Sequence, residues 1–469
     1  MNHPAKRNPW AWIPTLYFAQ GIPYFAVNMI SVMMFKRLGM SNADIALYTG
    51  WLYLPWVIKP FWSPIVDVIK TKRWWTVAMQ IIVTLALAGV AFTIPMPNVN
   101  ELALGNTPVN LFTLCLAIFW VMAFASATHD IASDGFYMLA LNTNEQSLFV
   151  GIRSTFYRCA SILGQGGLVA LAGYLEVSMN NIPKAWITTF ACMAVFFGIV
   201  SVYHLFILPY PKSDKPAVDA SGKSGVGAVV RSFGDSFATF FKKKYVVIAV
   251  LFMLLYRLPE AQLIKLIQPF LVDPQSVGGL GLTTAQVGLA YGTIGVIGLT
   301  VGGIIGGICA SAGGLKKWIW PMALCISLNS IVYILLSYFE PDVNTLGGSL
   351  AIYACVFIDQ FGYGFGFTAF MLFMMYFADG PYKTSHYAIC TAFMALGMML
   401  PGMIAGWVQE QLGYNGFFWY VLACTFATWG VTALVYPHID PNYGRKNREG
   451  GPSPKNKVAE ENIEEDIEV

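Results

Sequence analysis

A few charged side chains lie inside long apolar stretches of this sequence. Asp130 and Asp134 are four residues apart and therefore share one face of a helix. A charge at the centre of a bilayer costs at least ~2.5 kcal/mol, so ionisable groups kept there are expected to be functional. Here the chemistry would be binding and release of protons by carboxylates. Static ion pairing between helices is the alternative.

Two arginines follow the aspartates on the next predicted helix, beyond the polar turn 142–146. Counting outward from this turn places Asp134 at the depth of Arg153 and Asp130 at the depth of Arg158. The sequence therefore predicts two ion pairs between these helices.

Other charges lie inside other apolar stretches. Lys59 reaches a depth similar to that of the aspartates and is a third candidate partner for them. Arg257 and Glu260 flank Pro259, and Asp359 lies in the middle of its span. A kinked helix that carries a charge pair is typical of a gate or a binding element. A local pair that lines no cavity is the alternative.

Aromatic residues divide into two groups by depth. Trp10, Trp12, Trp74 and Trp75 lie at the predicted span ends, where aromatic belts form. Tyr17, Tyr24, Tyr53 and Trp56 lie deeper and could stack on a sugar ring, with ordinary helix packing as the alternative.

Enzymatic and metal-binding motifs are missing from the sequence. The eight cysteines all lie in apolar stretches without a CxxC spacing, and there is no HExxH motif or nucleophile elbow. We therefore expect neither an enzyme nor a metal or cofactor site.

The composition indicates which elements position these residues. Hydrophobic residues make up 56% and charged residues 11% of the 469 residues, against roughly 45–50% and about 25% in soluble domains. Continuous apolar runs that contain Gly and Pro favour membrane helices over barrel strands. We predict an all-α membrane protein with twelve transmembrane helices in two six-helix bundles. The expected spans are 11–35, 44–69, 74–95, 109–141, 147–175, 185–209, 244–271, 283–311, 317–338, 347–378, 383–411 and 415–437.

A polar stretch in the middle of the chain separates the two sets of helices. It is rich in Ser, Gly, Pro and Lys, as expected of a flexible linker. Five residues of the second span recur in the eighth at a constant offset of 242, which favours a duplicated transporter. The predicted organisation is a bundle over 1–210, a cytoplasmic linker over 211–243, a bundle over 244–437 and a disordered cytoplasmic tail over 438–469.

The basic residues are concentrated in alternate loops. Positive charge favours the cytoplasmic side, so both termini are expected there. The net charge is only +3 and forms no continuous stripe, which argues against nucleic acid as a partner.

Several segments together resemble the AmpG-type muropeptide permeases, a branch of the major facilitator superfamily that also includes the acetyl-coenzyme A transporters. The resemblance covers both halves of the chain. It implies two six-helix bundles around a central cavity and proton-driven import of anhydromuropeptides by a monomer in the bacterial cytoplasmic membrane. The segments are FAQGIPY (Phe18–Tyr24), KPFWSPIVD (Lys59–Asp67), FASATHDIASD (Phe124–Asp134), FYR ending at Arg158, LYRLPEA (Leu255–Ala261) and FGYGFGFTAF (Phe361–Phe370).

The resemblance also implies a set of cavity residues. Arg153 is not part of the family pattern, and Ser63 stands where glycine is usual. Other expected substrates on this scaffold are siderophores and oligosaccharides, and a membrane sensor that transports nothing is the alternative from another class. The residues carried over by motif are Gln20, Gly21, Lys59, Asp130, Asp134, Arg158, Arg257 and Glu260, with Asp130 and Asp134 as the proton-coupling pair and Tyr24 and Asp359 added as cavity candidates.

Overall fold

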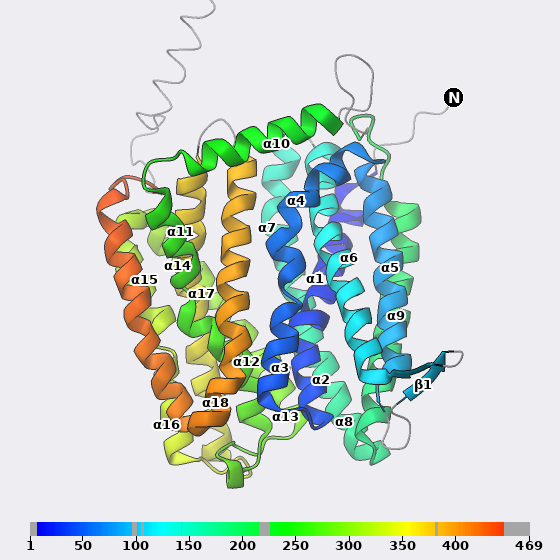
Figure 1. Cartoon of the computed structure of the whole chain (residues 1–469), viewed down its shortest axis with the longest axis vertical. Coiled ribbons are helices and arrows are strands. Elements are labelled where there is room, and N and C mark those ends of the chain that lie inside the picture. The colour runs from blue at the N-terminus through cyan, green and yellow to red at the C-terminus, as the bar shows by residue number, and fades with distance from the viewer. Residues whose placement is uncertain are drawn as a thin grey trace, which may run out of the picture.

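Almost the whole described chain is helical, and most helices run between the same two ends of the molecule (Figure 1). The computed structural model describes residues 7–95, 101–104, 107–141, 143–214, 226–379 and 383–444. Most of the predicted disordered tail, from residue 445 onward, lies outside the described residues.

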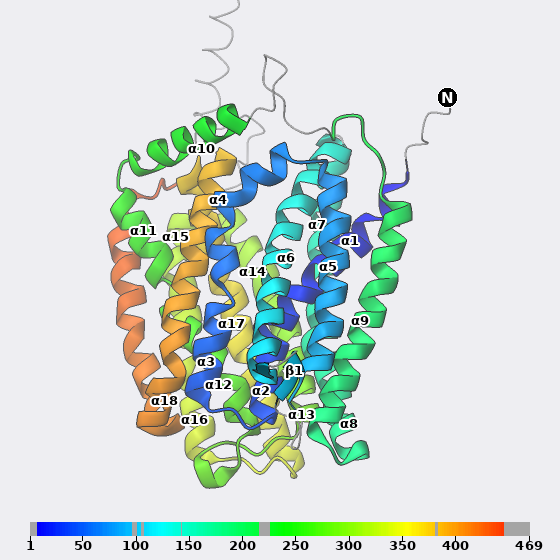
Figure 2. The same cartoon turned by 45° about the vertical axis from the view of Figure 1, so that its right-hand side comes forward.

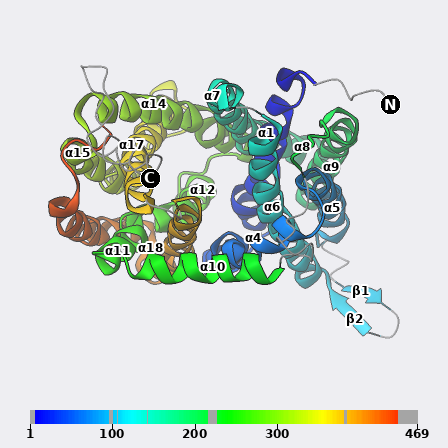
Figure 3. The same cartoon turned by 90° about the horizontal axis from the view of Figure 1, so that it is seen from above.

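The first half of the chain begins with a short helix, η1, and includes one small hairpin between α5 and α6. The hairpin is antiparallel, pairs Glu101 with Asn110, and projects at the edge of the molecule (Figure 3). The elements are η1 (Pro9–Ala11), α1 (Ile13–Phe25), η2 (Ala26–Ile30), α2 (Ser31–Arg37), α3 (Asn42–Trp51), α4 (Leu54–Val68), α5 (Lys72–Thr93), β1 (Glu101–Leu104), β2 (Thr107–Asn110), α6 (Leu111–Ala140), α7 (Thr143–Ser161), η3 (Ile162–Leu168), α8 (Val169–Met179) and α9 (Ile182–Ile207).

The second half follows helix α10 (Val226–Phe241), and all the regular elements among its described residues are helices. Its elements are α11 (Val246–Leu255), α12 (Leu258–Val272), η4 (Gln275–Val277), α13 (Thr284–Val287), η5 (Gly288–Gly295), α14 (Val296–Gly313), α15 (Leu315–Ser327), α16 (Ser330–Phe339), α17 (Leu346–Ala378), α18 (Lys383–Val435) and η6 (Tyr436–His438).

The helices give the predicted number of membrane crossings. The described residues contain ten helices that are long and apolar enough to cross a membrane. The longest, Ser385–His438, contains Gly413 with φ 67° and ψ 174°, so it comprises two crossings joined at a turn. Helices α3 and α4 run end to end and form one further crossing (Figure 1). Ten helices, the second part of α18 and the α3–α4 pair make twelve crossings.

The outer surface of the helices is apolar. Large hydrophobic side chains are exposed along it, among them Phe92 at 86% and Phe426 at 70% of their full exposure. Such a surface is stable in hydrocarbon, where helices satisfy their backbone groups internally. The protein is therefore a multi-pass membrane protein.

Two bundles lie side by side, and α10 crosses one end of both (Figures 1, 2 and 3). We call the end where α10 lies the linker side and the opposite end the far side. The ring of Phe237 on α10 lies 5.5 Å from that of Phe61 on α4, and Phe240 stacks at 6.2 Å on Phe393 of α18. Part of the linker that we predicted to be flexible is therefore a packed helix, because its aromatic side chains recur every three or four residues.

Helices α14 and α17 approach each other closely through glycines of α14. A Cβ atom added at Gly298 would lie 2.6 Å from the carbonyl oxygen of Phe357, and one at Gly302 would overlap the carbonyl oxygen of Phe361. One added at Gly307, on another face of the same helix, would have no heavy atom within 4 Å. The four-residue glycine spacing thus brings two helix backbones into contact.

We predict that Gly302→Ala destabilises the protein, because overpacking a close contact costs about 1–3 kcal/mol. Gly307→Ala is the matched control and is expected to be neutral or slightly stabilising, since alanine favours the helix. Thermal unfolding of both purified variants in detergent measures the difference. Equal unfolding midpoints would contradict the assigned α14–α17 contact.

Candidate functional site

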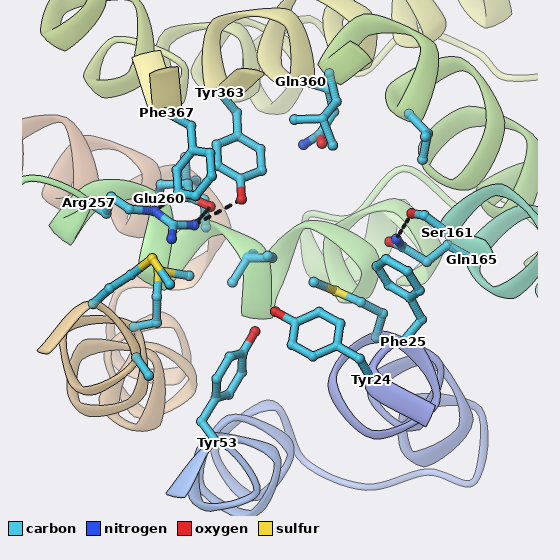
Figure 4. A pocket seen from close by; sticks show the side chains of 18 of the residues that line it. Tyr24, Phe25, Tyr53, Ser161, Gln165, Arg257, Glu260, Gln360, Tyr363 and Phe367 are labelled. Carbon is cyan, nitrogen blue, oxygen red and sulfur yellow. Dashed lines mark hydrogen bonds and ion pairs between the residues drawn. The ribbon is translucent and has the colours of Figure 1, made fainter. Parts of the chain in front are cut away.

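A cavity of about 380 Å³ lies between the two halves. Side chains from α1, α4 and α7 line it on one side, and side chains from α12, α17 and α18 line it on the other. Aromatic rings and a few polar groups alternate around it (Figure 4). This composition is typical of small-molecule sites, which combine apolar walls with a few placed polar groups.

Six of the predicted site residues line this cavity and four do not. Gly21 packs instead against α7, where an added Cβ atom would lie 2.7 Å from Cβ of Ala160. Its prediction as a cavity residue is therefore wrong, because the position serves close packing of α1 on α7. The lining residues are Tyr24, Lys59, Arg158, Arg257, Glu260 and Asp359, whereas Gln20, Gly21, Asp130 and Asp134 are not among them.

Asp130 is held by two side chains from other helices. The Lys59 ammonium of α4 lies 2.6 Å from Asp130 Oδ2, and the Gln20 amide of α1 donates to Oδ1. The predicted pair between Asp130 and Arg158 is wrong, and Lys59, the third candidate, takes that place. Counting residues from a turn gives the depth of a residue in the membrane, but it does not give the direction in which its side chain points from the helix axis.

Asp134 pairs with Arg153 as predicted. Arg153 Nη1 lies 3.4 Å from Asp134 Oδ1, and the Tyr17 hydroxyl donates to the same oxygen at 3.0 Å. The guanidinium also lies 4.7 Å from the centre of the Tyr17 ring. Both charged side chains are partly exposed, so the pair is more accessible than a buried salt bridge.

Arg257 and Glu260 form a bidentate ion pair at a break in the seventh crossing. Helix α11 ends at Leu255, and α12 begins at Leu258 with Pro259 in its first turn. Arg257 Nε and Nη2 lie 2.6 and 2.9 Å from the two Glu260 oxygens. The pair lines the cavity, so the alternative of a pair that lines nothing is wrong.

Tyr363 of α17 joins this pair to the aromatic wall. Its hydroxyl accepts a hydrogen bond from Arg257 at 3.0 Å (Figure 4). The guanidinium carbon of Arg257 lies 4.8 Å from the centre of the Phe367 ring. Across the cavity, the Tyr24 and Tyr53 hydroxyls point toward each other (Figure 4). The rings thus present both stacking faces and hydroxyl groups to a ligand.

Arg158 differs from the other basic side chains of the cavity. Lys59 and Arg257 each have a carboxylate partner, but no ion pair joins Arg158 to an acid in the described part of the chain. Its buried Nη1 atom has no hydrogen-bond partner. Its other terminal nitrogen approaches Gly303 of α14, where an added Cβ atom would lie 3.3 Å away.

Asp359 is buried at the cavity wall in the second half. It is 3% exposed, and its Oδ2 accepts from the Tyr333 hydroxyl at 2.8 Å and from the Gln360 amide at 2.9 Å. Asn329 donates to its backbone carbonyl at 2.8 Å. Within the described ranges no basic side chain forms an ion pair with it.

Sequence reasoning missed three wide helical turns that border the cavity. Segments η2, η3 and η5 are π-helices, a form often found at functional sites. They supply Met29, Gln165 and Tyr291 to the wall. Closely spaced glycines in η3 and η5 were the available sequence signal for these π-helices. The two segments contact each other across the interface between the halves.

Polar contacts join the two halves at the far side. Lys36, at the end of α2, lies 2.7 Å from Asp273, which follows α12. Tyr414 donates to Asp273 at 2.6 Å and accepts from Asn42 at 2.9 Å. Thr284 of α13 donates to the buried Glu176 of α8 at 2.8 Å. The far end of the interface is therefore closed in this structure.

Lys265 of α12 is a buried base without an acidic partner among the described residues. It is 1% exposed, donates to Thr49 of α3 at 3.0 Å and lies 4.9 Å from the Tyr53 ring. Thr49 keeps its own hydrogen bond to the carbonyl of Ile45. Lys265 therefore contrasts with Lys59, which has a carboxylate beside it.

We predict opposite effects for methionine at the two lysines. Lys59→Met leaves Asp130 without its cation and is expected to destabilise by about 1–3 kcal/mol. Lys265→Met removes an uncompensated buried charge and is expected to leave the stability unchanged or higher. Unfolding midpoints in detergent compare the two variants, and a larger loss for Lys265→Met would refute this account of the charges.

The fold and the central cavity define a membrane transporter of two helical bundles. The chain belongs to the Major Facilitator Superfamily, whose family model matches residues 15–385.

Curated relatives agree with this assignment. The chain is 25% identical over 405 residues to "Putative transporter AmpG 4" of Rickettsia felis, covering 83% of this chain and 89% of the relative. It is 24% identical over 439 residues to "Anhydromuropeptide permease" of Escherichia coli K12, covering 92% and 80%. The resemblance to AmpG-type permeases thus extends over most of the chain.

Solved structures share the fold. A transporter of the POT family, crystallised in complex with 5-aminolevulinic acid, superposes with a TM-score of 0.66 at 11% identity, covering 91% of this chain and 95% of that one. The relatives and the structural neighbours are transporters, and the chain is a Major Facilitator Superfamily transporter.

Proposed function

We propose that this protein is a proton-coupled importer of anhydromuropeptides in the bacterial cytoplasmic membrane. The observation that supports this most is a cavity between the two halves that combines stacking aromatic rings with a basic side chain, Arg158, that lacks an acidic partner in the described chain. The similarity to "Anhydromuropeptide permease" of Escherichia coli supports the choice of substrate.

The cavity wall suits a solute that contains both sugar and peptide. Tyr24, Tyr53 and Tyr363 offer ring faces to a sugar and hydroxyls to its oxygens. Arg158 offers a guanidinium to a carboxylate, and such charge-assisted hydrogen bonds are among the strongest available to a ligand. Lys59 and Arg257 are already paired with acids, so we assign the primary anion contact to Arg158.

Proton coupling is assigned to the two acids of α6. A proton bound by the Asp130 carboxylate neutralises it and leaves the Lys59 ammonium without its partner, free to attract an anionic substrate. Asp134 and Arg153 form the equivalent pair one turn along the helix. Each positive charge moved inward is favoured by ~2.3 kcal/mol per 100 mV of membrane potential.

The proposed orientation places the linker side in the cytoplasm. Lys212 and Lys242–Lys244 lie in the segment that joins the two halves, and positive loops favour the cytoplasmic face. Both termini then lie in the cytoplasm, and the closed far side faces outward. We propose that one chain, acting as a monomer, forms the transport unit, because both walls of the cavity come from the same chain.

We predict that vesicles containing the protein accumulate labelled anhydromuropeptide when energised and lose the accumulation when a proton uncoupler is added. Uptake that persists unchanged with the uncoupler would remove proton coupling. Correctly folded protein that shows no uptake would remove the substrate and direct the search to siderophores and oligosaccharides.

We predict that the double variant Asp130→Asn, Asp134→Asn abolishes accumulation against a gradient, because amides cannot bind and release the proton. Downhill exchange of substrate across the membrane is expected to survive, since the cavity residues are unchanged. Asp235→Asn on the exposed face of α10 is the control and is expected to transport normally. Proton-driven uptake by the double variant at the wild-type rate would exclude the assigned mechanism.

A further inference from the structure

Two side chains of opposite charge line the cavity without a compensating charge among the described residues. Arg158 projects from α7 in the first half, and Asp359 projects from α17 in the second. The remaining charged groups of the wall are paired, Lys59 with Asp130 and Arg257 with Glu260. Burying an unpaired charge is costly, so each of the two positions favours a partner supplied by a ligand.

One carboxylate oxygen of Asp359, Oδ1, accepts no hydrogen bond from the described residues. Both hydrogen bonds from Tyr333 and Gln360 end on Oδ2, and no described residue donates to Oδ1. A carboxylate has about four acceptor sites, so these two bonds leave acceptor capacity on Asp359, which lines the cavity. An ammonium group is the ligand that supplies both a positive charge and donors to such an oxygen.

The groups around Asp359 do not supply that positive charge. Tyr291 of η5, Tyr333 of α16 and Tyr363 of α17 are neutral donors or acceptors, and Glu260 of α12 is the acidic neighbour. Arg257 also lines the cavity, but its guanidinium is bound to both oxygens of Glu260. The surroundings of Asp359 therefore carry no excess positive charge and accommodate a cation.

Arg158 and Asp359 lie at different heights along α17, and this offset is one component of the distance that a ligand joining them spans. Arg158 lies at the level of Gly303, where an added Cβ atom would be 3.8 Å from the carbonyl oxygen of Gly364 on α17. Asp359 precedes Gly364 by five residues on the same helix, an offset of about 7.5 Å along the axis and about 140° around it. Two extended peptide residues span roughly 7 Å.

We propose that the cavity binds a zwitterionic peptide group of its substrate, with a carboxylate at Arg158 and an ammonium at Asp359. The inference rests on the proposed function only in treating this cavity as the transport site. A ligand held in this way bridges the two halves. It stabilises the arrangement in which they approach each other, because it binds that arrangement more tightly than one in which they are apart.

The test uses purified full-length protein and three small probes. Alanyl-alanine carries both charges, N-acetyl-alanyl-alanine lacks the ammonium, and alanyl-alanine amide lacks the carboxylate. Each probe at millimolar concentration is scored by the rise it causes in the unfolding midpoint. We expect alanyl-alanine to bind the wild type at least tenfold more tightly than either blocked probe.

Variants assign each end of the probe to one residue. Asp359→Asn is expected to lose the preference for alanyl-alanine over the N-acetyl probe and to keep the preference over the amide. Arg158→Gln is expected to show the reverse pattern. Asp359→Glu keeps the charge and is expected to retain the preference for the free amine, which separates loss of charge from misfolding.

Several outcomes would overturn the inference. Equal binding of all three probes to the wild type would do so, as would absence of binding by alanyl-alanine. An unchanged amine preference in Asp359→Asn, together with loss of uncoupler-sensitive accumulation, would make Asp359 a proton site instead. Failure of muropeptide uptake with intact probe discrimination would refute the proposed substrate but leave this inference standing.

Discussion

The way in which the helices of this protein pack depends on pairing buried charges with opposite charges, because the interior has a low dielectric constant. Most of the charged side chains that line the cavity are paired with a group from their own half. In the first half Lys59 of α4 and Gln20 of α1 both reach Asp130 of α6, so one carboxylate ties three helices together. In the second half Arg257 and Glu260 are paired across the break between α11 and α12. Because each pair lies within a single half, the halves can move relative to each other without separating these charges.

Contacts between the halves differ from these charge pairs within each half. At the far side they include polar contacts, such as the Lys36–Asp273 ion pair and the bonds of Tyr414. These side chains are largely buried in the closed arrangement, so water or new partners must replace their bonds when the interface opens. Deeper in the interface the backbones of η3 and η5 touch through glycines, and apolar side chains of both halves share one buried cluster. Closure at this end is therefore made by specific polar contacts together with apolar packing.

The sequence predicted the crossings and part of the site. Continuous apolar runs are sufficient to find membrane helices. The Asp134–Arg153 pair was found by counting depth, whereas Asp130 pairs with Lys59. Depth follows from sequence distance to a turn, but the direction in which a side chain points depends on how helices pack. The π-helical turns and the packing of α10 were not predicted, although the closely spaced glycines of η3 and η5 and the recurring aromatic residues of α10 carried a signal for them.

Arg158 and Asp359, the two cavity charges without an opposite partner among the described residues, explain how a ligand and a proton can act on the same transporter. Under the proposed function a proton on Asp130 weakens the hold on Lys59 within the first half, which adds positive potential to the wall that already carries Arg158. A carboxylate drawn there leaves the other end of the ligand facing Asp359 across the cavity. The substrate then supplies the charge pair that the protein lacks between its halves. Coupling in this view requires no mechanical link from Asp130 to Asp359, because both act on one ligand through the electrostatic potential of a shared cavity.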